Sequence, residues 1–123
     1  NPLTCTAVGK VLLAHGPAAL LEAELCNPPH ARTEYSITDR EALLAELEAV
    51  RRDGVAFDRQ EHERGVVCIA APVYGPQDRV LAAVGLSAPA PRVDATSCGR
   101  LTTGVRAAAD RLSRECLALA VER

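Results

Sequence analysis

Three polar side chains interrupt apolar stretches in the middle of the chain: a carboxylate at Asp58, a thiol at Cys68 and a hydroxyl at Ser87. The stretches 66–74 and 80–86 are rich in Val, Ile and Ala, which is typical of strands. The carboxylate accepts hydrogen bonds, the hydroxyl accepts and donates them, and the thiol is a weak donor. Small polar groups set into apolar strands indicate a ligand-binding pocket.

The alternation of side chains along a strand decides which groups meet. Successive residues point to opposite faces, so Cys68 shares a face with Ala70, and Ser87 shares one with Gly85. A floor of such small residues leaves volume that an occupant would fill, because protein interiors are densely packed. Close packing against a helix fits the same pattern, since glycine in a strand also marks close backbone approach. The residues alone leave both interpretations open.

Turn and helix signals predict the elements that position this floor. The segment 75–79 carries Gly, Pro and Asp, which predicts a turn joining the two strands as a hairpin, and 55–58 predicts a short strand before it. Segment 33–37 is either a short strand or an extended link. Apolar spacing predicts helices over 4–15, 18–25, a third helix ending at Gly54, and a final helix from residue 94 or 96 to about 120.

Capping residues refine these helix boundaries. Pro17 is expected as the first residue of the second helix, because its fixed φ suits that position. The prolines 28 and 29 are expected to follow its end. Thr38 is expected to cap the third helix as part of a capping box with Glu41, and Gly54 to end it in the left-handed conformation.

Two helices carry apolar stripes that predict their buried faces. For the third helix the stripe is Leu43, Leu44, Leu47 and Val50. For the final helix it is Leu101, Val105, Ala108, Leu112, Cys116 and Leu119. Helices around a central hairpin predict an α/β or α+β domain rather than a helical bundle.

Length and composition limit the function classes. A chain of 123 residues forms one domain with a hydrophobic core, and its start at Asn1 suggests a fragment of a longer protein. No apolar run approaches the ~20 residues that cross a bilayer, so no membrane association is expected. A net charge of -2, with Lys10 as the single lysine, argues against nucleic-acid binding by this segment. Contact with DNA is expected from another part of the protein.

Cysteine and histidine spacing gives no sign of a metal site or another cofactor. The residues are Cys5, Cys26, Cys68, Cys98 and Cys116, and His15, His30 and His62. They form no C-x-x-C pair and no Cys/His cluster. Unpaired, widely spaced thiols favour a reducing, cytoplasmic location.

Several motifs in register carry a family resemblance over nearly the whole chain. They are PLTCTAVGK at 2–10, Thr38-Asp39 with 43–51 and Gly54, DRQE at 58–61, Gly65 with CIAAPV at 68–73, and SAP at 87–89 with Arg92. With these motifs the chain resembles the C-terminal effector-binding domain of IclR-family bacterial transcription regulators. The resemblance implies a GAF-like fold, in which helices flank an antiparallel sheet with a small-molecule pocket on one face. It also implies homodimers or homotetramers.

The resemblance further implies that the first helix and strands of this domain, and a winged helix-turn-helix domain, lie upstream. Small carboxylate effectors would bind the backbone amides of Ala7 and Val8 and the side chains of Asp58, Cys68 and Ser87. Amides at a helix start favour an anion in any case, through exposed donors and the helix dipole.

One departure from the family pattern bears on the effector. Gly85 stands where the family has a serine, and Ala88 where it has a glycine. A missing hydroxyl removes a hydrogen bond of about 0.5–1.5 kcal/mol and enlarges the floor. We therefore expect a bulkier or less polar effector than a two- or three-carbon acid.

Alternatives remain for single residues and for function. Asp58 would repel an anionic ligand unless it is protonated or accepts a hydroxyl hydrogen, so it either contacts the ligand or bonds backbone near Gly65; Glu61 is expected to brace the same loop. The leading hypothesis is a ligand sensor without catalytic activity. The alternatives are an oligomerisation module with a filled pocket and a GAF-like enzyme that uses the Cys68 thiol. No histidine is predicted beside Cys68, and its apolar neighbours would raise its pKa.

Overall fold

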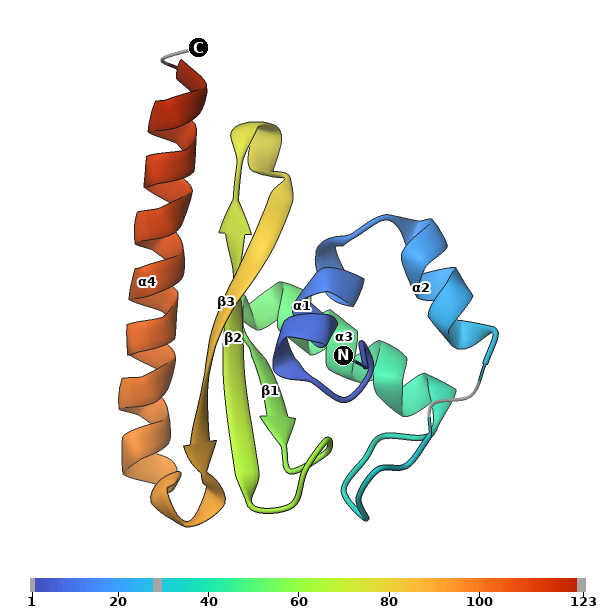
Figure 1. Ribbon diagram of the computed structural model, residues 1–123. Coiled ribbons are helices and arrows are strands. Elements are labelled where there is room, and N and C mark those ends of the chain that lie inside the picture. Colours follow the sequence, from blue (N-terminus) through green and yellow to red (C-terminus); the bar gives the residue numbers. More distant parts are fainter. Residues whose placement is uncertain (1, 28–29, 122–123) are drawn as a thin grey trace.

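A three-stranded antiparallel sheet separates two helical layers in the computed structural model, which describes residues 2–27 and 30–121 (Figure 1). The elements are α1 (Ala7–His15), α2 (Ala18–Leu25), α3 (Arg40–Asp53), β1 (Ala56–Arg59), β2 (Val66–Tyr74), β3 (Val80–Pro89) and α4 (Ala95–Val121). Short 3-10 helices span Pro76–Asp78 and Ala90–Arg92. The shorter helices lie on one side of the sheet and α4 covers the other. The predicted mixed fold with a long C-terminal helix is confirmed.

The predicted central hairpin is confirmed. Strand β2 has the expected bounds, and β3 continues past Leu86 to Pro89. Cys68 pairs with Ser87 and Ala70 pairs with Gly85, so these four residues share one face. Along its opposite edge β2 pairs with β1, and there Cys68 pairs with Asp58.

Helix α1 begins later than residue 4 because Thr6 is its cap. The Gly9 amide donates to Thr6 Oγ1 at 3.1 Å, and that hydroxyl donates to the carbonyl of Pro2 at 2.6 Å. The segment before the helix is thereby folded back over its first turn. A Cβ at Gly9 would overlap the backbone of Leu3, so this close approach requires glycine.

The predicted range 18–25 matches α2, but two predicted positions at helix starts are wrong by one residue. Pro17 has extended backbone and precedes α2 as its cap, so it is not the first helical residue; Pro28 and Pro29 lie outside the described residues. Asp39, not Thr38, caps α3, and its Oδ2 accepts from the Ala42 amide at 2.9 Å. Adjacent residues that can both cap make such a shift easy. The left-handed Gly54 end of α3 is confirmed.

The segment 33–37 is a link and not a strand. Its turn is closed by a hydrogen bond from the Ser36 amide to the carbonyl of Thr33 at 3.3 Å. The hydroxyls of Thr33 and Ser36 donate to carbonyls of the β1–β2 loop. The backbone of this segment is therefore held by side-chain hydrogen bonds and not by a sheet.

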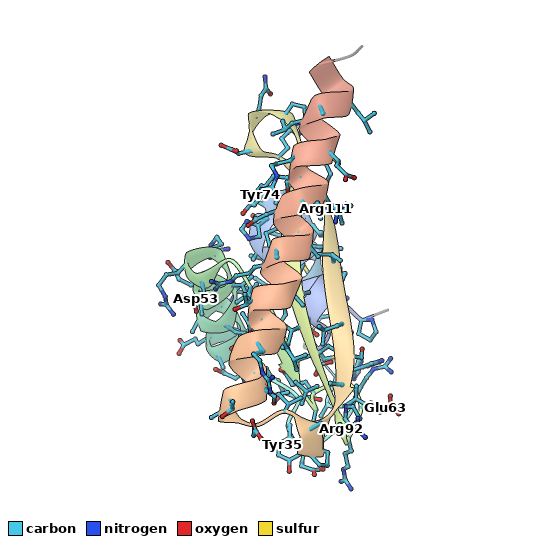
Figure 2. The ribbon with its side chains drawn as sticks, turned by 90° about the vertical axis from the view of Figure 1, so that its left-hand side faces the viewer. Tyr35, Asp53, Glu63, Tyr74, Arg92 and Arg111 are labelled. Carbon is cyan, nitrogen blue, oxygen red and sulfur yellow. The ribbon has the colours of Figure 1, made fainter. Side chains whose placement is uncertain are left out.

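Each face of the sheet has its own apolar core. The α1-side core is formed by Ala7, Val11, Leu13, Ala14, Leu43, Leu47, Val50, Ala56 and Ala70. The α4-side core is formed by Val55, Ile69, Ala71, Val73, Val105 and Ala109. Figure 2 shows α4 running along the strands it covers. Of the helices in the described part of the chain, none combines the length and apolarity needed to cross a bilayer.

The predicted stripe of α4 is partly wrong. Val105 is buried, and Leu101 and Cys116 are partly buried as expected, but Ala109 takes the buried place predicted for Ala108. The exposed residues are Ala108, Leu112 and Leu119. Residues 107–109 are three consecutive alanines, so hydrophobicity alone cannot show whether the buried residue lies three or four positions after Val105. In α3 the buried residues are Leu43, Leu47 and Val50, while Leu44 is half-buried.

Candidate functional site

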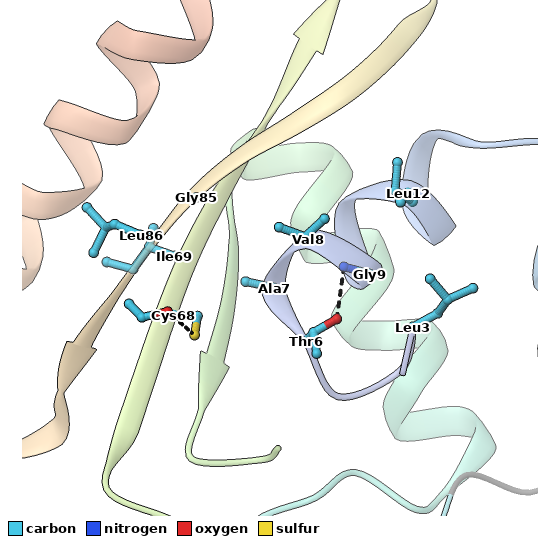
Figure 3. Close-up of a pocket in the computed structure, with 11 residues that line it drawn as sticks. Leu3, Thr6, Ala7, Val8, Gly9, Leu12, Cys68, Ile69, Gly85 and Leu86 are labelled. Carbon is cyan, nitrogen blue, oxygen red and sulfur yellow. Dashed lines mark hydrogen bonds between the residues drawn. The ribbon is translucent and has the colours of Figure 1, made fainter. Parts of the chain in front are cut away.

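A cavity of about 340 Å³ lies between the first turn of α1 and the β2–β3 hairpin (Figure 3). It is lined by Leu3, Thr6, Ala7, Val8, Gly9, Leu12, Cys68, Ile69, Gly85, Leu86 and Ser87. Its volume falls in the range of about 300–1,000 Å³ that small-molecule sites occupy. Of the sequence-predicted site residues, the structure brings together Ala7, Val8, Cys68, Gly85 and Ser87.

Backbone donors stand on the helical side of the cavity. The Gly9 amide is taken by Thr6 Oγ1 and the Lys10 amide by the carbonyl of Thr6 at 2.9 Å. The amides of Ala7 and Val8 find no acceptor within residues 2–27 and 30–121. Unpaired amides at a helix N-terminus attract negative charge, so this wall suits a carboxylate.

The strand side of the cavity supplies a pair of small polar groups. Cys68 Sγ lies 3.1 Å from Ser87 Oγ, and either atom can be the donor. The hydroxyl retains further hydrogen-bonding capacity toward the cavity, because one contact does not exhaust a serine. Figure 3 shows Ala7 on the side of α1 that is turned toward the strand carrying Cys68. The floor and the helix start thus face each other.

Gly85 gives the floor its flat shape. An added Cβ there would lie 2.9 Å from the Ile69 carbonyl oxygen and 3.2 Å from Ala70 Cβ. A serine at this position would therefore push β3 away from β2. Compared with serine, glycine at position 85 removes a hydroxyl from the floor and also lets the two strands approach closely.

The remaining walls are apolar. The side chains of Ile69 and Leu86 pack into the α4-side core, so these residues offer mainly backbone to the cavity. Leu3 and Leu12 are partly buried, and Val8 is 41% exposed at the opening. An apolar cavity with donors at one end suits a molecule that has an acidic group and an apolar body.

Asp58 does not line the cavity. Its side chain is buried, and its Oδ1 accepts from the amides of Glu61 at 2.8 Å and His62 at 3.4 Å. The carboxylate therefore holds the loop between β1 and β2. This geometry supports the structural alternative for Asp58, although the bonded amides lie nearer to it than Gly65.

Burial raises the pKa of the Cys68 thiol, and the negative charge of Asp58 raises it further, while the hydrogen bond with Ser87 lowers it in part. A nucleophilic cysteine needs the opposite shift and a neighbouring base. The imidazole of His62 contacts a different thiol, with its Nδ1 3.8 Å from Cys5 Sγ. Among residues 2–27 and 30–121, no three His, Cys, Asp or Glu side chains are grouped so that they could hold a metal ion.

Lys10 is an important residue that the sequence analysis missed. Its side chain is 0% exposed. Its Nζ donates to Glu61 Oε2 at 2.7 Å, to the carbonyl of Phe57 at 2.7 Å and to Glu46 Oε1 at 3.3 Å. Lys10 shares a helical face with Ala7 and Ala14, which was the available signal that it points inward. Glu61 braces its loop as expected, since Oε2 also accepts from the Arg59 amide at 3.1 Å.

A mixed helix–sheet domain with an apolar cavity between a helix start and a hairpin has the features of a ligand-binding domain. The family model for the bacterial transcriptional regulator IclR C-terminal region matches residues 1–114, and the chain belongs to this family. The resemblance found in the sequence is thereby confirmed.

Individual relatives agree with this assignment. The chain is 38% identical over 114 residues to the HTH-type transcriptional regulator XynR of Escherichia coli, covering 92% of this chain and 45% of that protein. It thus spans less than half of that regulator. The crystal structure of the C-terminal domain of E. coli KdgR matches with a TM-score of 0.85 and 35% identity, over 94% of this chain and 71% of that one. The inducer-binding domain of an Acinetobacter PobR double mutant, in complex with 3-hydroxybenzoic acid, matches with a TM-score of 0.82 and 30% identity, over 92% and 66%.

Proposed function

We propose that this chain senses a small organic or aromatic carboxylate, which binds in the cavity between α1 and the hairpin. The acid would accept hydrogen bonds from the amides of Ala7 and Val8 and meet Cys68 and Ser87 on the floor, with Gly85 leaving room for a flat apolar body. Asp58 would hold the adjacent loop. The observation that carries the proposal is that Ala7 and Val8, whose amides have no acceptor among the described residues, line the same apolar cavity as the Cys68–Ser87 pair.

An aromatic acid is the favoured class. The apolar walls offer little to compensate the polar surface of a two- or three-carbon acid, whereas they can bury a ring. The double mutant of the related PobR inducer-binding domain is in complex with 3-hydroxybenzoic acid, which has this character.

The signal would pass to DNA through a winged helix-turn-helix domain outside this chain. With a net charge of -2, this chain by itself has little attraction for the phosphates of DNA. Binding can shift a regulator only if the effector has different affinities for two states. We infer that these states belong to a cytoplasmic homodimer or homotetramer, and that the upstream part of the protein also supplies the first helix and strands of this domain.

Neither alternative function finds support in these contacts. A filled pocket is disfavoured because about 340 Å³ stays open. A thiol enzyme is disfavoured because burial raises the pKa of Cys68, which is opposite to the shift that a nucleophilic cysteine needs.

Isothermal titration calorimetry on the full protein tests the proposal. The probes are benzoate, 3-hydroxybenzoate, acetate and propionate, and we expect the aromatic acids to bind more tightly. Ser87→Leu and Cys68→Trp should each weaken binding by about tenfold or more, because they fill the cavity. Cys26→Trp, at an exposed position outside the cavity, is the matched control and should leave affinity unchanged. Aromatic acids that fail to bind, or that bind equally well to the filled variants, would refute the proposed site.

A further inference from the structure

We propose that Lys10 is a positioning residue for the cavity: its buried ammonium sets the height of the first turn of α1 above the sheet. The inference rests on the proposed function, because it assigns Lys10 the task of holding the acid-binding amides in place. Lys10 itself does not line the cavity.

The position of Lys10 in the chain joins it directly to the cavity wall. It follows Thr6–Gly9, the turn that lines the cavity, and its own amide bonds to the carbonyl of Thr6. A displacement of its side chain along the helix axis therefore moves the amides of Ala7 and Val8 as well.

The partners of the ammonium belong to three different parts of the fold. Phe57 is in β1, Glu61 is in the loop after it, and Glu46 is in α3. Phe57 directly precedes Asp58, and Asp58 is the register partner of Cys68 in the floor. Lys10 thus ties the helical wall to a strand that is hydrogen-bonded to the floor.

The cluster has the features of a directional anchor rather than of general packing. Apolar contacts between α1 and the sheet, such as those of Ala7 and Val11, tolerate small sliding movements. A charged group with hydrogen bonds of 2.7 Å to Glu61 and to the Phe57 carbonyl does not, because buried ions are costly when they lose their partners. The other oxygen of Glu61, Oε1, is buried with no partner among the described residues, so the ammonium is the main charge holding this carboxylate.

A double variant separates positioning from simple stability. Lys10→Met alone leaves Glu61 and Glu46 without their cation and is expected to destabilise the fold. Lys10→Met/Glu61→Gln removes both charges of the close ion pair, and the glutamine oxygen can still accept from the Arg59 amide, so stability should be restored. We expect this double variant to recover a thermal midpoint within about 3 °C of the wild type. Its affinity for 3-hydroxybenzoate should stay lower by about tenfold, because the anchor is still absent.

Hydrogen exchange supplies a readout that needs no ligand. In the double variant the α1 amides from Val11 to Ala14 should exchange about tenfold faster than in the wild type. Leu13→Ala is the matched control, since Leu13 is a buried residue of the same helix without polar contacts. It should lower the thermal midpoint while changing affinity less than about twofold.

The outcomes are distinguishable. A double variant that regains both stability and affinity, or whose α1 exchanges at the wild-type rate, overturns the role of Lys10. A wild type that binds no aromatic acid overturns the proposed effector class, and the exchange measurement still decides whether Lys10 anchors α1. If the double variant does not fold, Glu61→Gln is compared with Glu46→Gln. The first should loosen α1 more, because Glu61 is closer to Nζ and more buried, and equal effects would contradict the anchor.

Discussion

The two faces of the β2–β3 hairpin are built by alternating residues of the same strands and have opposite characters. On the α4 side, Ile69, Ala71 and Val73 pack with Val105 and Ala109 into an apolar core. On the α1 side the small residues, among them Cys68, Gly85 and Ser87, leave a cavity open. A single register therefore places the α4-side core and the α1-side cavity on opposite faces of the same strands.

Charge follows the same division. The buried ionisable side chains Lys10, Asp58 and Glu61 all lie on the α1 side or in its loop, and Val105 on the other side meets apolar partners. A cavity forfeits packing contacts and buried ions cost solvation, so the α1 side stabilises the fold less efficiently. The α1 side also contains the larger set of buried apolar residues, which offsets these costs.

The largest loss of stability is expected from a substitution in the α4-side core. Val105→Asp would bury an unpaired carboxylate between α4 and the sheet, where Val105 is 4% exposed. We expect a loss of at least about 4 kcal/mol in the free energy of unfolding, measured by urea denaturation with circular dichroism. The control Ala107→Asp, on the exposed face of the same helix, should change it by about 0.5 kcal/mol or less. Similar losses in the two variants would show that α4 is not packed as described.

A smaller loss of stability is expected from a substitution in the first turn of α1, beside the cavity. Gly9→Ala would drive a methyl group into the backbone of Leu3 and the Thr6 hydroxyl, displacing the segment that folds over α1. Overpacking of this kind costs about 1–3 kcal/mol, and the cavity should lose affinity for aromatic acids. Gly99→Ala is the matched control, since a Cβ there meets open space within α4, and it should stabilise the protein by about 0.5–1 kcal/mol. Urea denaturation and calorimetry measure both; a neutral Gly9→Ala would contradict the close approach.

The division between the two faces was largely predictable from the sequence. The Val- and Ile-rich runs defined β2, and period-two alternation grouped Cys68 with Ala70 and Ser87 with Gly85; the register of the structure then places these two groups on one face. The helix start that faces them was expected as an anion site, although Thr6 caps it later than predicted. Local patterns were sufficient because strand pairing across a short turn is itself a local event.

The buried charges were not predictable in the same way. The partners of Lys10 lie between 36 and 51 residues away in sequence, and no local pattern connects them. A lysine on a helix is normally assigned to the surface, since isolated buried ammonium groups are rare. The register of α4 failed for a different reason: the packing surface of the sheet, and not the helix sequence, selects Ala109 over Ala108.

The alkylation rates of two cysteines test the assignment of Cys68 to the cavity without any substitution in the protein. Burial raises the pKa of Cys68, so its thiolate fraction at pH 7.5 is smaller than that of a free cysteine. Iodoacetamide should therefore modify Cys68 more slowly than the exposed Cys26, as followed by peptide mass spectrometry. An aromatic acid in the cavity should slow Cys68 further and leave Cys26 unchanged. Equal rates at the two thiols, or no protection at saturating ligand, would contradict the assignment of Cys68 to the cavity floor.

The smallest effect on stability is expected at the C-terminal end of α1. There the rings of His15 and Tyr74 meet edge-on, with their centroids 6.1 Å apart. Burial lowers the pKa of His15, and the Arg51 guanidinium lowers it further. Below about pH 6.5 the unfolded chain therefore binds a proton at this position more readily than the folded one, so stability falls as the pH drops.

We expect the free energy of unfolding to decrease between pH 7.5 and 5.5 and His15→Gln to reduce that slope. His30 and His62 are retained in the variant. An unchanged slope would contradict the burial of His15 at the C-terminal end of α1.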